Sequence, residues 1–230
     1  MALQIMLLAG CDKAPASAVT NDSATAAATA APDVARPAGP ERLILAFGDS
    51  LYAGYGLSRG QSLPDAIQAR LRKNGVNATI VNAGVSGDTS AAGLQRLGFA
   101  LDNLTRKPDL VMIGLGGNDV LRQIGPAETR ANMTAMMAEL AKRDIPVVLT
   151  GMKAPPNLGP DYAKAFDAIW PDLAKRYDAA LYPFILDGVI DRPTLLQPDH
   201  IHPTAAGVRV VADRLLPVVQ RELADTAINR

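Results

Sequence analysis

From Leu43 onward, short apolar runs alternate with longer amphipathic stretches, and no other feature of the sequence constrains the fold as strongly. The apolar runs have the length of buried strands, whereas the stretches between them repeat apolar residues at helical spacing. The predicted strands are 43–47, 78–82, 110–115, 146–150 and 180–184. The predicted helices are 64–73, 93–104, 128–143, 162–177 with a break or restart at Pro171, and 204–223. Such alternation predicts an α/β fold, a three-layer α/β/α sandwich around a central parallel sheet of about five strands.

Length and charge narrow the class of protein. The chain has 230 residues, which is enough for one domain of ordinary size plus a tail. Lys plus Arg and Asp plus Glu number 23 each and no basic stripe stands out, so a nucleic-acid partner is not expected. Beyond the N-terminus no apolar run is long enough to span a bilayer, so the body of the chain is not predicted to be an integral membrane protein.

The N-terminal string MALQIMLLAGC is a short apolar run that ends in a cysteine. It resembles a bacterial lipobox, in which the cysteine becomes the lipidated first residue, although no Lys or Arg precedes the run. We therefore expect residues 1–11 to be a lipoprotein signal segment, with Cys11 tethering the protein to a membrane. The expected location is a bacterial cell envelope, either periplasmic or lipid-anchored. The alternative is an apolar N-terminus with an inert thiol.

Residues 12–41 are rich in Ala, Pro, Ser, Thr and Asp and have almost no large apolar side chains. Such a segment cannot bury enough surface to offset the entropy lost on ordering. We predict a disordered tether over 12–41 and a folded domain over 42–230.

Four polar clusters lie just after predicted strands or just before the last helix. They are GDS at 48–50, GVSGD at 84–88, GGND at 116–119 and DHIHP at 199–203. Each cluster alone is compatible with an ordinary turn. Ligands of parallel α/β sheets bind beyond the carboxyl ends of the strands, so together the clusters predict one site at that edge.

Acyl transfer needs a nucleophile, a base, an acid that orients the base, and donors for the oxyanion. Ser50 supplies a hydroxyl, His202 can accept its proton near neutral pH, and Asp199 can hold the imidazole. The backbone N–H of Gly87 and the side-chain amide of Asn118 are candidate oxyanion donors. The four clusters therefore offer every group that ester hydrolysis requires.

These strings together resemble the SGNH hydrolases, the GDSL esterase/lipase family, over residues 43 to about 223. The resemblance is carried by GDSLYAGYGL, the glycine of the second cluster, GGND and the Asp-x-x-His pair. GDSLYAGYGL and GMKAPPNLGPDY further resemble the bacterial arylesterase and multifunctional thioesterase I/lysophospholipase branch.

The resemblance implies an SGNH hydrolase domain with a flavodoxin-like sheet. It implies Ser50 as the nucleophile, with Asp199 and His202 completing the triad. It also implies an oxyanion hole made by the N–H of Ser50, Gly87 and Asn118. No metal or organic cofactor is implied, and the expected partner is a small-molecule ester. The sequence does not indicate an oligomeric state.

A second histidine, His200, stands at a position where a small residue is more usual in the family. The Asp-x-x-His spacing favours His202 as the base, and an extended stretch would point His200 away from it. Further residues near the clusters are expected to contact substrate: Asp49, Leu51, Arg122, Met152, Pro155 and Pro156.

We therefore predict a serine esterase that hydrolyses short- to medium-chain aryl or alkyl carboxylic esters through an acyl-enzyme. The alternatives are an acyl thioesterase or lysophospholipase with the same machinery, a carbohydrate deacetylase, and a catalytically silent tethered binding module. The sequence contains no Gly-x-Ser-x-Gly elbow, P-loop or His-Glu-x-x-His string, and GLGGND lacks the third glycine of a dinucleotide fingerprint.

Overall fold

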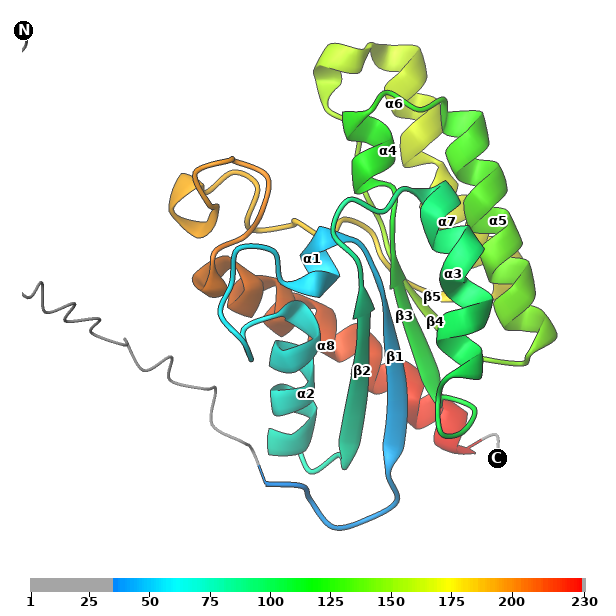
Figure 1. Ribbon diagram of the computed structural model, residues 1–230, viewed down its shortest axis with the longest axis vertical. Helices are drawn as coiled ribbons and strands as arrows, with labels where there is room; N and C mark the ends of the chain where they lie inside the picture. Colours follow the sequence, from blue (N-terminus) through cyan, green and yellow to red (C-terminus); the bar gives the residue numbers. More distant parts are fainter. Residues whose placement is uncertain (1–34, 229–230) are drawn as a thin grey trace, which may run out of the picture.

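A five-stranded sheet forms the centre of the computed structural model, which describes residues 35–228 (Figure 1). The strands are β1 (Arg42–Gly48), β2 (Ala78–Gly84), β3 (Leu110–Gly114), β4 (Val147–Thr150) and β5 (Ala180–Tyr182). Their order is β2-β1-β3-β4-β5, and every neighbouring pair is parallel. This is the flavodoxin-like order, in which the direction of winding changes between β1 and β3. The predicted parallel α/β sheet is confirmed.

Helices cover both faces of this sheet and complete the three predicted layers. The helices are α1 (Ser50–Ala53), α2 (Leu63–Lys73), α3 (Ser90–Asp102), α4 (Gly117–Leu121), α5 (Pro126–Lys142), α6 (Pro160–Asp167), α7 (Ile169–Tyr177) and α8 (Ala205–Ile228). Two 3₁₀ turns, η1 (Pro156–Leu158) and η2 (Pro193–Leu195), lie in the loops that follow β4 and β5. Helices α2 and α8 pack on one face of the sheet, and α3, α5 and α7 cover the other (Figure 1).

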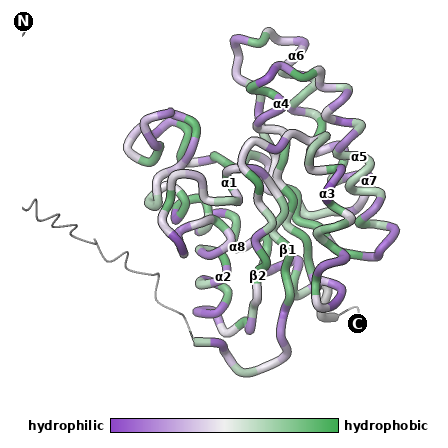
Figure 2. Tube along the Cα trace, in the orientation of Figure 1, coloured by the Kyte–Doolittle hydropathy of each residue, from purple (hydrophilic) through white to green (hydrophobic). Residues whose placement is uncertain are grey.

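The sheet has an apolar core on each face, because alternate side chains of a strand point to opposite sides. On β1, Ile44 and Ala46 join the core beneath α2 and α8. Leu45 and Phe47 join the core beneath α3, α5 and α7. All four side chains are buried, and Figure 2 shows hydrophobic residues along the central strands. A strand buried on both faces appears in the sequence as a continuous apolar run, which is why it could be predicted.

Short polar side chains set the starts of the helices. Ser62 and Asp65 form a capping box at α2, in which each side chain accepts the backbone N–H of the other. Thr89 caps α3 by accepting the N–H of Ala92. Helix α3 therefore begins at Ser90, three residues before the predicted start at position 93. That start was placed from the apolar stripe alone, without the cap.

The helical stretch 162–177 is interrupted, but the predicted break at Pro171 is wrong. Helix α6 ends at Asp167 and α7 begins at Ile169, so Pro171 lies in the first turn of α7. Proline is tolerated there because first-turn N–H groups have no acceptor within the helix. The sequence also gave no sign of α1 and α4, which have 4 and 5 residues and are too short to show helical periodicity.

A row of glycines crosses the sheet where three strands end. Gly48 of β1 is in register with Gly84 of β2 and with Gly114 of β3. A Cβ added at Gly48 or Gly114 would lie 2.5 Å from the ring of Tyr52, and one added at Gly84 would collide with backbone of α1. The Tyr52 side chain is fully buried on this row. The glycines therefore allow α1 to lie directly on the sheet, which fixes the position of its first residue.

Residues 1–34 lie outside the described part of the chain, and with them Cys11 and most of the predicted tether. Residues 35–41 contain no helix or strand and lead into β1. Over the described residues, no helix combines the length and the apolar character that a membrane span needs. Lipid anchoring at Cys11 and an envelope location stay predictions.

Candidate active site

The four polar clusters of the sequence meet at the carboxyl edge of the sheet. Ser50 begins α1 after β1, Gly87 follows β2, and Asn118 lies in α4 after β3. Because β1 lies between β2 and β3, these residues surround the point where the winding changes direction. The loop before α8 contributes the fourth cluster, which contains Asp199 and His202.

A chain of two hydrogen bonds links Ser50 to Asp199. Ser50 Oγ lies 2.8 Å from His202 Nε2, and His202 Nδ1 lies 2.6 Å from Asp199 Oδ2. Asp199 Oδ1 also accepts the backbone N–H groups of Ile201 at 2.9 Å and of His202 at 3.0 Å. A hydroxyl, an imidazole and an orienting carboxylate thus lie within hydrogen-bonding reach, which is the geometry for general-base activation of a serine.

The hydrogen bonds that Asp199 accepts from Ile201 and His202 also determine its charge. Partial desolvation acts to raise the pKa of Asp199, but hydrogen bonds from the N–H and ring of His202 and from the N–H of Ile201 outweigh it. The pKa of Asp199 therefore falls from 3.8 to about 2. The carboxylate stays ionised at neutral and mildly acidic pH, where it can stabilise positive charge on the imidazole.

The stretch that carries the two histidines was expected to be extended, and it is not. His200 has a φ of 57°, in the left-handed region, and it lines the same cavity as His202. This bend folds the chain back so that the N–H of His202 reaches the carboxylate of Asp199. Of the two histidines, His202 is the one hydrogen-bonded to Ser50.

The three candidate oxyanion donors belong to residues that line a cavity beside His202. They are the backbone N–H groups of Ser50 and Gly87 and the side-chain amide of Asn118. As the first residue of α1, Ser50 has no helical acceptor for its N–H. Gly87 is the third residue of a turn closed by Asp88 N–H and the Val85 carbonyl, and its φ of +88° favours glycine. Asn118 Nδ2 donates one hydrogen to the Asp88 carbonyl at 3.0 Å and has a second hydrogen to offer.

Ser50 and His202 line a cavity of about 510 Å³ whose walls are mostly apolar side chains. Its volume lies in the range of about 300–1,000 Å³ that is usual for small-molecule sites. Five residues that were expected to contact substrate line it: Asp49, Leu51, Met152, Pro155 and Pro156. Leu121, which follows Asn118 and was also a candidate for the wall, lines it too. Five large apolar side chains that were not expected in the wall also line it: Tyr55, Phe184, Leu186, Ile190 and Ile201.

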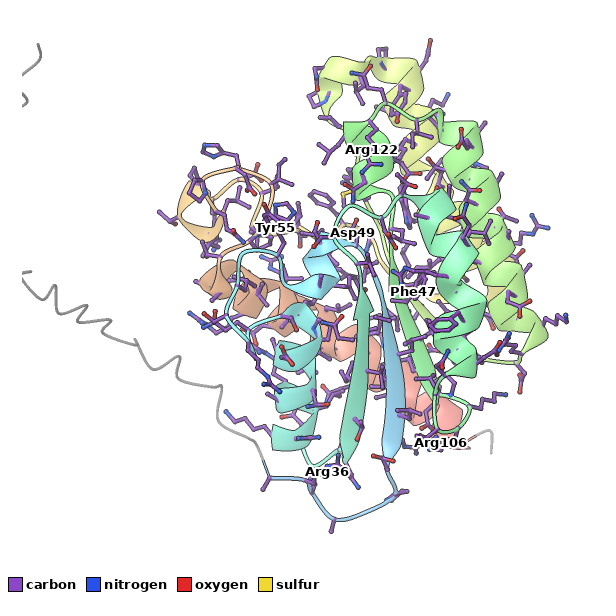
Figure 3. The ribbon with its side chains drawn as sticks, viewed as in Figure 1. Arg36, Phe47, Asp49, Tyr55, Arg106 and Arg122 are labelled. Atoms are coloured by element: carbon purple, nitrogen blue, oxygen red, sulfur yellow. The ribbon has the colours of Figure 1, made fainter. Side chains whose placement is uncertain are left out.

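Arg122 was expected in the wall of the site, but it is not one of the residues that line the cavity. Its Nη2 donates to the carbonyl of Gly87 at 2.9 Å. Figure 3 shows Arg122, the residue after α4, close to the edge of the sheet where Asp49 lies. Arg122 therefore joins α4 to the turn that carries Gly87.

Tyr55 is a neighbour of the imidazole that the motif analysis missed. Its ring centroid lies 4.5 Å from that of His202, with the planes inclined by 37°. Gly54 ends α1 with a φ of 83°, and this left-handed cap turns the chain toward the histidine. Gln197 Nε2 donates to the Tyr55 carbonyl at 2.7 Å, and Gln197 N–H donates to the His202 carbonyl at 2.7 Å. Tyr55 therefore contacts the ring of His202, and Gln197 links the loop of His202 to the backbone of Tyr55.

Asp49 places a buried carboxyl group next to the nucleophile. Its side chain accepts the N–H of Leu51 at 3.1 Å and caps α1. Burial raises the pKa of Asp49 to about 6, with Asp119 and Asp88 adding to the rise and the Leu51 N–H and His202 opposing it. The group therefore changes charge around pH 6, whereas an ordinary aspartate does so near pH 4.

We expect Asp49→Asn to stabilise the protein at high pH and not at low pH. The folded pKa of about 6 exceeds the model-peptide value of 3.8, so the folded state binds the proton more tightly, and the stability that this proton provides is lost as pH rises through 6. This difference corresponds to about 3 kcal/mol, and asparagine removes the buried charge while it can still cap Leu51. Urea unfolding at pH 3.5 and pH 8 measures the effect. A gain that is equal at both pH values, or one shared by the exposed control Asp191→Asn, would contradict it.

Residues 35–228 contain no group of three His, Cys, Asp or Glu side chains that could hold a metal ion.

The chain is similar to enzymes of known name over most of its length. The esterase TesA of Pseudomonas aeruginosa is 38% identical over 177 residues, which are 77% of this chain and 87% of that protein. The thioesterase 1/protease 1/lysophospholipase L1 of Escherichia coli is 34% identical over 183 residues, 78% of this chain and 86% of that protein. Among solved structures, the SGNH-hydrolase family esterase AlinE4 is 54% identical, with a TM-score of 0.69, over 80% of this chain and 97% of its own. Residues 46–210 match the GDSL-like lipase/acylhydrolase family, and the chain therefore belongs to this family of ester hydrolases, also called the SGNH hydrolases.

Proposed function

We propose that the protein is a serine esterase that uses Ser50, His202 and Asp199 as its catalytic triad. The observation that carries this proposal is the unbroken hydrogen-bond chain, 2.8 Å from Ser50 to His202 and 2.6 Å from His202 to Asp199. Ser50 and His202 line a cavity whose walls are mostly apolar. This supports an ester as the substrate, because the alkyl or aryl groups of an ester are apolar.

In the proposed reaction, Ser50 Oγ attacks the ester carbonyl carbon while its proton passes to His202 Nε2. The tetrahedral oxyanion accepts hydrogen bonds from the N–H of Ser50, the N–H of Gly87 and the amide of Asn118. The C–O bond to the alcohol breaks, and the alcohol leaves with the proton from His202. Water then gives a proton to His202 and its oxygen attacks the acyl carbon. The bond between this carbon and Ser50 Oγ breaks, the carboxylic acid leaves, and His202 returns its proton to Ser50.

Short- to medium-chain esters are the proposed substrates, because the cavity of about 510 Å³ can enclose such an ester. A second candidate, a long-chain acyl thioester or a lysophospholipid, is favoured by the rim of the cavity. Four cavity residues are large, apolar and still more than a third exposed, and they could support a chain that extends beyond the cavity: Tyr55, Leu121, Ile190 and Ile201. The Escherichia coli relative is named as a thioesterase and lysophospholipase.

A chain-length series separates these candidates. We expect kcat/KM for p-nitrophenyl esters to be highest between acetate and octanoate and to decrease toward palmitate. A maximum at palmitate, with comparable turnover of palmitoyl thioester, would favour the second candidate. A fluorophosphonate probe applied to the same sample tests for an activated serine, and absence of both turnover and labelling would leave a silent binding module.

A further inference from the structure

Arg96, on α3, makes several contacts with segments next to the proposed oxyanion hole. Its Nε donates to Asp88 Oδ2 at 2.5 Å, Nη1 donates to the carbonyl of Ala83 at 2.8 Å, and Nη2 donates to the carbonyl of Gly48 at 2.9 Å. Its guanidinium carbon also lies 4.0 Å from the centre of the Phe47 ring. All three nitrogens of one guanidinium are therefore bonded to acceptors on three different segments.

These acceptors lie next to the proposed catalytic groups. The Gly48 carbonyl is two residues before Ser50, and the Asp88 side chain is one residue after Gly87. The Asp88 carbonyl accepts the amide of Asn118 at 3.0 Å. A single side chain thus connects the end of the nucleophile strand, the turn that carries one oxyanion donor and the residue that orients another.

We propose that Arg96 is a positioning residue that fixes the three oxyanion donors relative to the nucleophile. This proposal rests on the proposed function, because it concerns the hole that the reaction would use. Arg96 is not one of the residues that line the cavity. It acts through Asp88 and the two carbonyls, and does not touch substrate.

Burial and geometry make this contact set more than a surface ion pair. The side chains of Arg96 and Asp88 are 23% and 11% exposed, so water competes little for their hydrogen bonds. The planar fork of a guanidinium can serve three acceptors in fixed directions, whereas a lysine ammonium is a point charge on a flexible stem. Lysine at position 96 could keep the charge but not the geometry.

The helix that carries Arg96 is itself fixed to α4. Asp119, next to Asn118, is fully buried and accepts the N–H of Ser90, the first residue of α3, at 2.8 Å. Asp119 also accepts the hydroxyls of Ser90 and Thr129. Because α3 and α4 are joined in this way, the helix of Arg96 is held next to the helix of Asn118.

Arg96→Lys tests the proposal. We expect kcat for p-nitrophenyl butyrate to fall about 10- to 100-fold with little change in KM, since misplaced donors weaken only the transition state. The inhibition constant of an alkylboronic acid, which forms a tetrahedral adduct on serine, should rise by the same factor as kcat/KM falls. Inhibition by the product butyrate should be unchanged. Arg143→Lys, which alters an arginine paired with Asp102 and Glu139 away from this edge, should keep wild-type kcat.

Asp88→Ala provides a second variant in case Arg96→Lys does not fold. This variant removes the side-chain acceptor on the turn, while Arg96 keeps its two carbonyl acceptors. We expect the same fall in kcat and in boronate affinity. In the double variant kcat should be little lower than in either single variant. Wild-type kcat and boronate affinity in folded Arg96→Lys or Asp88→Ala would overturn the proposal. A wild-type enzyme with no turnover and no boronate binding would instead overturn the proposed function, so the two failures are distinguishable.

Discussion

Ser50→Ala is expected to reduce kcat for p-nitrophenyl butyrate by about 10⁵-fold or more, because the reaction loses its covalent intermediate. Any remaining turnover would come from water attack assisted by the oxyanion donors. The fold should not change, because the cap of α1 is the side chain of Asp49 and alanine is favourable in a helix. The variant should therefore keep its melting temperature while it loses both turnover and labelling by a fluorophosphonate.

A matched serine sharpens this test. Ser58 lies on the exposed loop between α1 and α2, and it is its backbone N–H that bonds to Gln61. Ser58→Ala should keep wild-type kcat and wild-type labelling. Activity that survives in Ser50→Ala, or labelling that is retained there and lost in another serine variant, would show that Ser50 is not the nucleophile.

The central strands of the sheet were predictable from the sequence because they are buried on both faces. Leu43–Phe47 and Leu110–Gly114 are continuous apolar runs for this reason, and the polar clusters that follow them must lie at the same edge once the strands are parallel. Short elements gave no such signal. The position of helix α1 depends on the tertiary contact of Tyr52 with glycines on three strands, and no local sequence pattern predicts that contact.

The residues of the site that contribute reactive side chains could be predicted from the motifs. Contacts that depend on backbone conformation or backbone carbonyls could not. Asp199 and His202 could be paired by spacing alone, but the left-handed turn at His200 could not be foreseen, because such a φ is uncommon outside glycine. Arg96 escaped notice because two of its three acceptors are carbonyls of Ala83 and Gly48. Every residue has a carbonyl, so no sequence pattern marks these two.

Asp199→Asn is expected to reduce kcat by about 10³- to 10⁴-fold with KM nearly unchanged. An asparagine keeps an oxygen that can accept the N–H groups of Ile201 and His202, so the turn should survive. Its amide nitrogen would then face His202 Nδ1, which must accept rather than donate. The imidazole proton moves to Nε2, and that nitrogen can no longer take the proton of Ser50.

The carboxylate of Asp199 is partly exposed, with 35% of its side chain accessible, so solvent can replace some of its effect on charge but not its effect on the tautomer. The loss should therefore appear in kcat and in the rate of fluorophosphonate labelling to the same degree, since both need an activated Ser50. Asp191→Asn alters an exposed carboxylate on the same loop and should change neither rate. If Asp199→Asn kept wild-type kcat, His202 would not depend on Asp199 for its tautomer, and the proposed triad would reduce to a serine–histidine pair.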